Sequence, residues 1–331
     1  MKSNFLDLLH SGEKSISVTG LGYVGLPLAL AFGKLFQVIA YDINEIRIGL
    51  LQENNDVDGE VDKSQFENKN VFFTAKAADL RKAHFHLICV PTDIDNYMIP
   101  DLDPLKKASQ VVGKNLKKGD YVIYESTVYP GCTEEVCLPI LEEYSGLTRS
   151  RDFKVGYSPE RVVPGSKEKS LDEIVKIVSG EDTEALDTIS EIYQTILKKD
   201  VYRVSTIRIA EAAKVIENTQ RYLNISFINE LSMLLNKMNI DTNEVLEAAA
   251  TKWNFHPYSP GLVGGHCISV DPFYLLYKAN EIGFDSQLIT AGARINDSMP
   301  NFIAKSLVQK LLSIDKHPLN STNKCNSLLL S

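Results

Sequence analysis

A glycine-rich turn near the start of the chain has the spacing of a dinucleotide-binding loop. Gly20, Gly22 and Gly25 form a GxGxxG motif between an apolar run and a helical pattern, which is the context that such a loop requires. Gly20 permits a tight turn, Gly22 lets the backbone approach a pyrophosphate, and Gly25 lets helix and strand pack closely. The amide groups at the helix start would form the anion site. The alternative interpretation is an ordinary glycine turn.

An acidic residue follows the glycines at the distance typical of a ribose-binding carboxylate. Asp42 ends the second apolar run, about 20 residues after the first glycine. A carboxylate there accepts hydrogen bonds from the ribose hydroxyls and repels a 2′-phosphate, so the sequence favours NAD over NADP. We expect Arg47 to stack on adenine or to bind the pyrophosphate. A surface aspartate beside a turn is the alternative.

Two threonines come directly after later apolar runs. Thr92 ends the segment CVPT, and Thr127 lies in the segment ESTV. Because ligands of open α/β sheets bind at the carboxyl ends of the strands, we expect both hydroxyls to line the cofactor groove. Each is otherwise an ordinary turn or N-cap threonine.

A second group of polar residues shares one face of an expected helix. Lys214, Asn218 and Arg221 are spaced i, i+4, i+7. An ammonium, an amide and a guanidinium together suit a phosphate and a developing oxyanion. A solvated helix face is the alternative.

A cysteine follows a run of glycines further along. Cys267 comes after Gly261, Gly264 and Gly265, and Asp271 lies four residues beyond it. The glycines leave the thiol accessible, and a nearby cation would favour the nucleophilic thiolate. Alternatively, Cys267 is a small buried apolar residue.

The segment SPERV follows another apolar run. Glu160 in this segment is a candidate for a base or for holding a water, and Arg161 for binding substrate. By itself the segment also fits a surface turn.

The elements that position these residues alternate between strand and helix in the first half of the chain. This alternation predicts a parallel, doubly wound α/β sheet of the Rossmann-like type. A helix is expected over residues 26–36. Strands are expected over residues 16–19, 38–41, 71–73, 85–90, 121–124, 155–157 and 174–178.

The second half is predicted to be helical. Residues 206–239 contain no Gly or Pro, and their apolar residues recur at three, four or seven, which predicts one helix of ~30 residues. Asp241 begins the next helix with Glu244 as a capping box, and more helix is expected from 272 to about 314. We therefore expect an NAD-binding Rossmann-like domain over 1–205, a central helical domain over 206–314 and an unstructured tail over 315–331.

Composition sets the protein class. Hydrophobic residues make up 44% and charged residues 24% of 331 residues, which is typical of a globular protein of two domains. The formal charge of −8 argues against nucleic acid or an anionic membrane as the main partner. Without an apolar run of ~20 residues or a signal peptide, we expect a cytoplasmic protein. Five scattered cysteines without a CxxC pair favour neither disulfides nor a metal site.

Together these motifs resemble the UDP-glucose/UDP-N-acetylhexosamine 6-dehydrogenase family from about residue 15 to about 314. The GGHC form of the cysteine loop resembles the N-acetylhexosamine branch, in particular bacterial enzymes acting on UDP-GlcNAc or UDP-GalNAc that feed O-antigen or capsule sugars. The segments that carry the resemblance are GLGYVGLP at 20–27, CVPT at 89–92, ESTVYPG at 125–131, YSPERVVPG at 157–165, AEAAKVIENTQR at 210–221 and GLVGGHCISVDP at 261–272.

The resemblance implies an activity and a role for each matching residue. The family oxidises C6 of a UDP-sugar from alcohol to acid with two NAD⁺ and no metal. Cys267 matches the nucleophile that forms a thioester, and Lys214 matches a proton donor and acceptor. Asn218 would hold the oxyanion, and Glu160, Thr127 and Asp271 would position the hydrolytic water. NAD contacts match Tyr23, Val24, Asp42, Arg47, Thr92 and Thr127, and substrate contacts match Arg161, Val162, Lys214, Asn218, Arg221, His256, Gly261 and Gly264.

Three functions stay open at this point. The first is a working UDP-N-acetylhexosamine 6-dehydrogenase, expected to be a homodimer through its long helix. The second is a truncated, impaired NAD-binding dimer, because the family's third, uridine-binding domain has no match in the sequence. The third is a two-electron β-hydroxyacid dehydrogenase, which shares this layout but needs no thiol in the glycine loop.

Overall fold

The computed structural model describes residues 4–66, 70–161, 171–265, 268–315 and 329–330. Two compact units divide the chain. The first comprises Met1–Asp95 and Pro100–Lys214, and the second comprises Asn96–Ile99 and Val215–Ser331.

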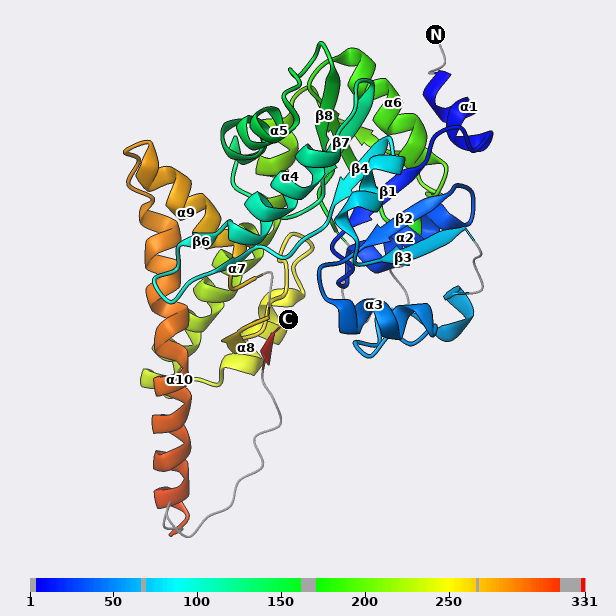
Figure 1. Cartoon of the computed structure of the whole chain (residues 1–331). Helices are drawn as coiled ribbons and strands as arrows, with labels where there is room; N and C mark the ends of the chain where they lie inside the picture. The colour runs from blue at the N-terminus through cyan, green and yellow to red at the C-terminus, as the bar shows by residue number, and fades with distance from the viewer. Residues whose placement is uncertain (1–3, 67–69, 162–170, 266–267, 316–328, 331) are drawn as a thin grey trace. The chain divides into compact units, whose positions relative to one another are not determined.

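The first unit is built around an eight-stranded sheet with the order β10-β9-β8-β7-β4-β1-β2-β3 (Figure 1). The predicted doubly wound α/β fold is confirmed. The order reverses between β1 and β4, and this reversal is where ligands of such sheets bind. The strands are β1 (Ile16–Thr19), β2 (Val38–Tyr41), β3 (Val71–Thr74), β4 (Phe85–Ile88), β7 (Asp120–Tyr124), β8 (Phe153–Tyr157), β9 (Ile177–Gly180) and β10 (Tyr202–Arg203).

The sheet departs from the prediction at β9. This strand runs antiparallel to β8, with Tyr157 opposite Ser179, whereas the other neighbours are parallel. It also begins at Ile177 rather than at the predicted residue 174. The preceding segment leaves the ladder because its groups bind the loop after β8: the carbonyl of Val175 accepts from Arg161, and Lys176 turns its side chain inward.

Helices cover both faces of this sheet, as the buried apolar strands require. On one face, the rings of Phe32 in α2 and Tyr193 in α6 lie 5.8 Å apart, centroid to centroid. On the other face α4 and α5 pack against each other (Figure 1). The helices of this unit are α1 (Asn4–His10), α2 (Gly25–Gly33), α3 (Glu45–Gln52), α4 (Asp103–Asn115), α5 (Leu138–Ser145) and α6 (Thr183–Gln194).

Short elements fill the connections. A two-stranded hairpin joins β5 (Asp93–Ile94) to β6 (Pro100–Asp101). The other short elements are 3₁₀ helices at Lys63–Phe66, Ala77–Lys82 and Leu171–Glu173 and a π-helical turn at Thr133–Cys137.

The predicted long helix is confirmed as α7 (Ile207–Lys237), which begins in the first unit and continues in the second. The second unit then contains α8 (Thr242–Ala250), α9 (Asp271–Glu281) and α10 (Gln287–Ser313). Asp241 caps α8 by accepting hydrogen bonds from the backbone amides of Asn243 and Glu244. None of the helices in the described part of the chain has both the length and the apolar character of a membrane span.

The helix expected from residue 272 to about 314 is present as two helices, with an interruption between α9 and α10. Gly283 adopts a positive φ of 75°, the left-handed conformation that ends helices. The amides of Gly283 and Phe284 donate back to the carbonyls of Asn280 and Ala279, which satisfies the free end of α9. In the segment expected to be an unstructured tail, Leu329–Leu330 form β12 beside β11 (Leu262–Val263), and residues 316–328 lie outside the described residues.

Candidate active site

The glycine turn after β1 has one closed side and one open side. A Cβ on Gly20, whose φ is +90°, would lie 2.9 Å from the carbonyl oxygen of Cys89, and a Cβ on Gly25 would lie 1.9 Å from that of Gly20. A Cβ on Gly22 would meet nothing within 4 Å. The turn is therefore packed against the protein at Gly20 and Gly25 and open at Gly22, so it fits the pyrophosphate of a dinucleotide.

Asp42 braces this turn from the end of β2. Its Oδ2 accepts a hydrogen bond from the amide of Leu21 at 2.8 Å, and its Oδ1 accepts from the amide of Asn44 at 2.9 Å. The residue is half-buried. Because a carboxylate offers about four acceptor positions, both oxygens keep capacity for ribose hydroxyls.

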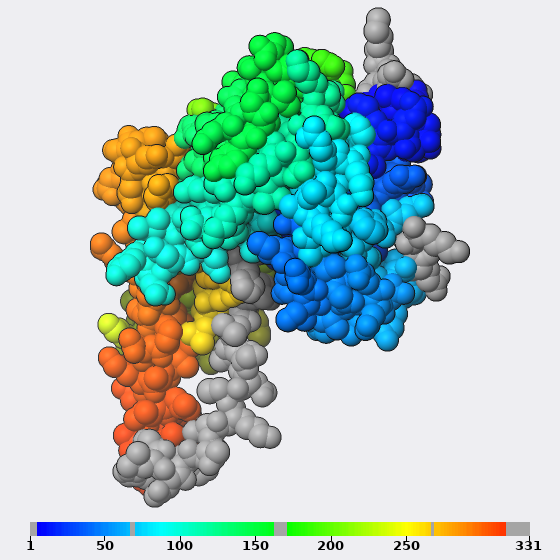
Figure 2. Space-filling view, viewed as in Figure 1, coloured from blue at the N-terminus to red at the C-terminus, as the bar shows by residue number. Residues whose placement is uncertain are grey.

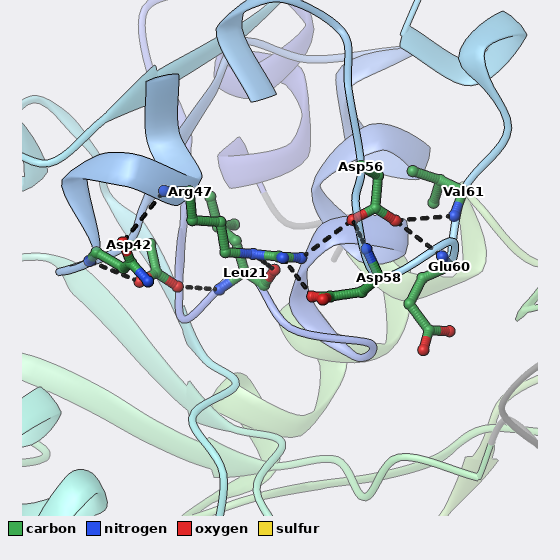
Figure 3. Close-up of polar contacts among 8 residues, drawn as sticks. Leu21, Asp42, Arg47, Asp56, Asp58, Glu60 and Val61 are labelled. Atoms are coloured by element: carbon green, nitrogen blue, oxygen red, sulfur yellow. Dashed lines mark hydrogen bonds and ion pairs between the residues drawn. The ribbon is translucent and has the colours of Figure 1, made fainter. Parts of the chain in front are cut away.

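Arg47 lies beside the same turn and is held by an acidic loop (Figure 3). Its Nε donates to the carbonyl of Leu21 at 2.7 Å, while its terminal nitrogens contact Asp58 and, at 3.4 Å, Asp56. Asp56 in turn accepts hydrogen bonds from the amides of Glu60 and Val61. The guanidinium predicted to contact the cofactor is thus fixed at the edge of the cofactor turn.

The loops after β4 and β7 are tied together by two hydroxyl groups. Thr92 Oγ1 donates to the carbonyl of Thr127 at 2.7 Å, and Ser126 Oγ donates to the carbonyl of Val90 at 2.6 Å. Both strands end at the same edge of the sheet as β1. The structure therefore brings together the two threonines that sequence spacing placed at this edge.

A buried group of charges, which the sequence analysis did not find, lies next to Glu160. Lys176 Nζ is 2.6 Å from Glu125 Oε2, 3.8 Å from Glu160 Oε2 and 3.3 Å from the carbonyl oxygen of Pro159. The Tyr193 hydroxyl donates to the other oxygen of Glu125, and the Tyr193 ring centroid lies 5.2 Å from the ammonium. We refer to Glu125, Lys176 and Tyr193 as the Lys176 cluster.

Burial controls the ionisation of this cluster. Desolvation raises the pKa of Glu125 to about 7, although Lys176 acts in the opposite direction. Desolvation lowers the pKa of Lys176, but Glu125 and Glu160 outweigh it and raise that pKa above its ordinary value. Lys176 is therefore a buried cation. The sequence feature that could have revealed this cluster is the lysine inside the apolar run IVKIV, because a buried ammonium needs an acidic partner.

A second residue that the sequence analysis did not find is Glu211, in the first half of α7. Its Oε2 accepts from the amide of Gly131 at 2.5 Å, and its Oε1 accepts from the amide of Thr133 at 2.9 Å. Burial raises its pKa to about 7. Glu211 thus fastens the ESTVYPG loop to the turn of α7 that carries the buried Lys214.

In the second unit, two asparagines of α7 hold the glycine-rich loop and its end. Asn218 Nδ2 donates to Asp271 Oδ2 at 2.5 Å, and Asp271 is 2% exposed. Asn229 exchanges two hydrogen bonds with Gly261, one from its Nδ2 to the carbonyl at 3.0 Å and one from the glycine amide to its Oδ1 at 2.8 Å. Gly264 follows and is half-buried.

The other residues that were predicted to bind cofactor or substrate, or to act in catalysis, lie in several parts of the chain. Arg221 on α7 and His256 are exposed in the second unit, and Tyr23 is 37% exposed beside the half-buried Val24. Arg161 donates from its own amide to Glu160 Oε1 at 2.7 Å. The predicted nucleophile Cys267 and the predicted substrate contact Val162 lie outside the described residues.

Both units match one enzyme family. Residues 14–197 match the NAD binding domain of the UDP-glucose/GDP-mannose dehydrogenase family, and residues 208–298 match its central domain. The chain belongs to the UDP-glucose/GDP-mannose dehydrogenase family. NAD is accordingly its cofactor, which confirms the prediction made from the GxGxxG motif and Asp42, and the chain is an NAD-dependent dehydrogenase.

Several members of the UDP-glucose/GDP-mannose dehydrogenase family are closely similar to it. Protein CapL of Staphylococcus aureus is 52% identical over 300 residues, which cover 91% of this chain and 71% of CapL. The UDP-N-acetyl-D-glucosamine 6-dehydrogenase of Pseudomonas aeruginosa is 52% identical over 301 residues, with the same coverage. The solved structure of UDP-D-ManNAc dehydrogenase from Pyrococcus horikoshii superposes with a TM-score of 0.84 at 32% identity and covers 92% of this chain and 73% of that one.

Proposed function

We propose that this dehydrogenase oxidises C6 of a UDP-N-acetylhexosamine, UDP-GlcNAc or UDP-GalNAc, to the uronic acid for surface polysaccharide synthesis. Relatives named UDP-N-acetyl-D-glucosamine 6-dehydrogenase are 50% and 52% identical to it. The observation that carries the proposal is the hydrogen bond from Asn218 to Asp271, because it joins the first residue of α9, which follows Cys267 by four positions in the sequence, to the helix that also bears Lys214.

The first two electrons leave as a hydride from C6 of the alcohol. In this proposal Lys214 accepts the hydroxyl proton as the aldehyde forms. The bound NAD⁺ supplies the hydride acceptor for this step and for the later oxidation. Arg161, Val162, Arg221, His256, Gly261 and Gly264 are the proposed contacts to the nucleotide-sugar.

The second oxidation is proposed to proceed through a covalent bond to the chain. The Cys267 thiolate attacks the aldehyde carbon, and Lys214 and the Asn218 amide stabilise the resulting oxyanion. Loss of the second hydride leaves a thioester on Cys267. Thr127, Glu160 and Asp271 position the water that attacks the thioester carbon, the carbon–sulfur bond breaks, and the acid is released. One alcohol, two NAD⁺ and one water thus give one carboxylate, two NADH and three protons.

The stoichiometry of NADH tests this proposal. Purified protein is mixed with NAD⁺ and a limiting amount of UDP-GlcNAc or UDP-GalNAc, and absorbance at the NADH band is followed to completion. Two NADH per sugar are expected. One NADH per sugar would instead support a two-electron dehydrogenase, and NAD⁺ binding by calorimetry without any NADH from either sugar would support an inactive binding protein.

We further propose that the enzyme is a homodimer through α7. Four large apolar residues of this helix, Ile209, Ile216, Phe227 and Leu234, are between 47% and 55% exposed. Their spacing of seven, eleven and seven residues places them along one side of the helix. Exposed apolar residues that repeat along one side of a helix are typical of a protein interface. Further exposed apolar residues occur on α10, the orange to red helix in Figure 2.

Light scattering distinguishes the two states of assembly. The wild-type protein is expected at twice the mass of its chain. Replacing Ile216→Asp and Phe227→Asp together should give a monomer, whereas the same change at exposed Leu288 of α10, Leu288→Asp, should leave the dimer intact. A wild-type protein that is monomeric at micromolar concentration would contradict the proposal.

A further inference from the structure

The Lys176 cluster has no role in the reaction as it is described above. Its members come from three elements of the first unit: Glu125 follows β7, Lys176 precedes β9, and Tyr193 lies on α6. All three are almost inaccessible, with Lys176 at 3% exposure and Glu125 at 1%. Such a group is costly to bury, since each ion loses its hydration. The cluster lies beside Glu160, and this position indicates which side chain the buried ammonium can act on.

Glu160 reaches the cluster through the ammonium group of Lys176. The Glu160 side chain is itself 9% exposed, and its Oε2 lies 3.8 Å from Lys176 Nζ. Its other oxygen, Oε1, accepts a hydrogen bond from the amide of Arg161. One carboxylate oxygen is thus held by the backbone and the other faces a fixed positive charge. This arrangement fixes the direction of the carboxylate.

Contacts with three residues hold the ammonium of Lys176 in this position. Glu125 accepts its short hydrogen bond, the carbonyl of Pro159 accepts another, and the face of Tyr193 lies alongside. The Tyr193 hydroxyl in turn fixes Glu125. The Pro159 carbonyl belongs to the residue next to Glu160, so Lys176 binds both the backbone and the side chain of this turn.

We propose that Lys176 is a positioning residue for Glu160 and that Glu125 and Tyr193 hold Lys176 in place. The inference rests on the proposed function, in which Glu160 helps to position the water that cleaves the thioester. Without the ammonium, Glu160 Oε2 loses the positive charge that it faces, and the side chain turns away from this position. In that orientation Glu160 does not hold the water, so hydrolysis of the thioester should slow. The two hydride transfers do not use Glu160 and should proceed.

The resulting kinetic pattern is specific. Two NADH are formed before hydrolysis, so a Lys176→Met variant mixed with excess NAD⁺ and UDP-sugar should release a burst of two NADH per active subunit. A steady rate should follow that is about tenfold or more below the wild-type rate. Mass spectrometry of the acid-quenched protein should show the sugar nucleotide attached to the chain. The KM for the UDP-sugar should change less than about threefold. Lys118→Met, which removes an exposed lysine of the same unit, is the matched control.

A second variant separates this role from folding. Lys176→Met leaves the Glu125 carboxylate buried without its cation, whereas Lys176→Met with Glu125→Gln removes both charges at nearly constant shape. We expect the double variant to melt close to the wild-type temperature and still to show the burst followed by slow turnover. Wild-type turnover in the folded double variant, or equal loss of the burst and of the steady rate, would overturn the proposal. Wild-type protein that forms no NADH would refute the proposed function itself, and this inference would fall with it.

Discussion

The amide nitrogen of the Asn218 side chain lies 2.5 Å from a carboxylate oxygen of Asp271. Asp271 is the first residue of α9, where a negative charge is favoured by the helix dipole, and it is almost fully buried. One hydrogen bond therefore joins α7 to the first residue of α9. Residues 53 positions apart in the sequence depend on each other for their orientation.

We expect Asp271→Asn to reduce turnover strongly while leaving cofactor binding intact. The substitution keeps the shape but replaces a carboxylate by an amide, which accepts the Asn218 hydrogen bond only weakly and no longer orients water as an anion. A fall in kcat of about a hundredfold is expected, with an unchanged Kd for NAD⁺ by calorimetry. Asp285→Asn, at an exposed position before α10, is the control. Weaker NAD⁺ binding in Asp271→Asn would contradict this assignment.

Asp42→Asn should weaken NAD⁺ binding and reduce the preference for NAD⁺ over NADP⁺. The carboxylate accepts hydrogen bonds from the amides of Leu21 and Asn44 and is the proposed acceptor for the ribose. Losing a charge-assisted hydrogen bond costs about 1.5–3 kcal/mol, which corresponds to about tenfold or more in Kd.

Calorimetric titration with both cofactors measures this change. Asp62→Asn, which removes an exposed carboxylate of the same unit, should leave both dissociation constants as they are. If Asp42→Asn bound NADP⁺ as poorly as the wild type does and NAD⁺ equally well, Asp42 would not face the ribose.

Gly22 and Gly25 of the glycine turn should respond differently to the same added methyl group. Gly25→Ala places a Cβ 1.9 Å from the carbonyl oxygen of Gly20, so it should destabilise the first unit by about 3 kcal/mol. Gly22→Ala meets no protein atom within 4 Å, so the variant should fold normally but bind NAD⁺ more weakly. Thermal unfolding with and without NAD⁺ measures both effects. Equal melting temperatures for the two variants would show that the turn is not packed as described.

Glu211 should make stability fall between about pH 4.5 and about pH 7. Burial raises its folded-state pKa to about 7, from an ordinary value of 4.5. In this window the folded chain binds more protons at this group than the unfolded chain does, so the free energy of unfolding decreases as pH rises. At about 1.4 kcal/mol per pKa unit, the loss is about 3 kcal/mol.

Urea unfolding at a series of pH values measures this dependence. Glu211→Gln removes the ionisation and keeps only one of the two oxygens that accept from the amides of Gly131 and Thr133, so the variant should be less stable overall, and its stability should vary less over the same window. Glu217→Gln, on the same helix, is the control. An unchanged pH dependence in Glu211→Gln would assign the effect to another group.

Local patterns were sufficient for the cofactor end of the molecule. The strands before Gly20 and Asp42, the glycine spacing and the single helix α7 were all predicted within a few residues, because each depends on near neighbours in the sequence. The break at Gly283 also depends on a local feature, a glycine that adopts a positive φ, although the expectation of helix from 272 to about 314 did not mark it.

Tertiary structure alone decided which charges meet. From the sequence alone, Lys176 was predicted only as part of an apolar strand, and Glu125 was recognised only as part of the motif ESTVYPG. They are 51 positions apart and become partners because β7, β8 and β9 are neighbours in the sheet. The antiparallel direction of β9 likewise depends on the assembled sheet and not on the local sequence. The periodicity of apolar residues predicts the secondary structure of a segment. Which buried charges become partners depends on the assembled sheet, because a buried ion needs a partner to offset the free-energy cost of losing its hydration.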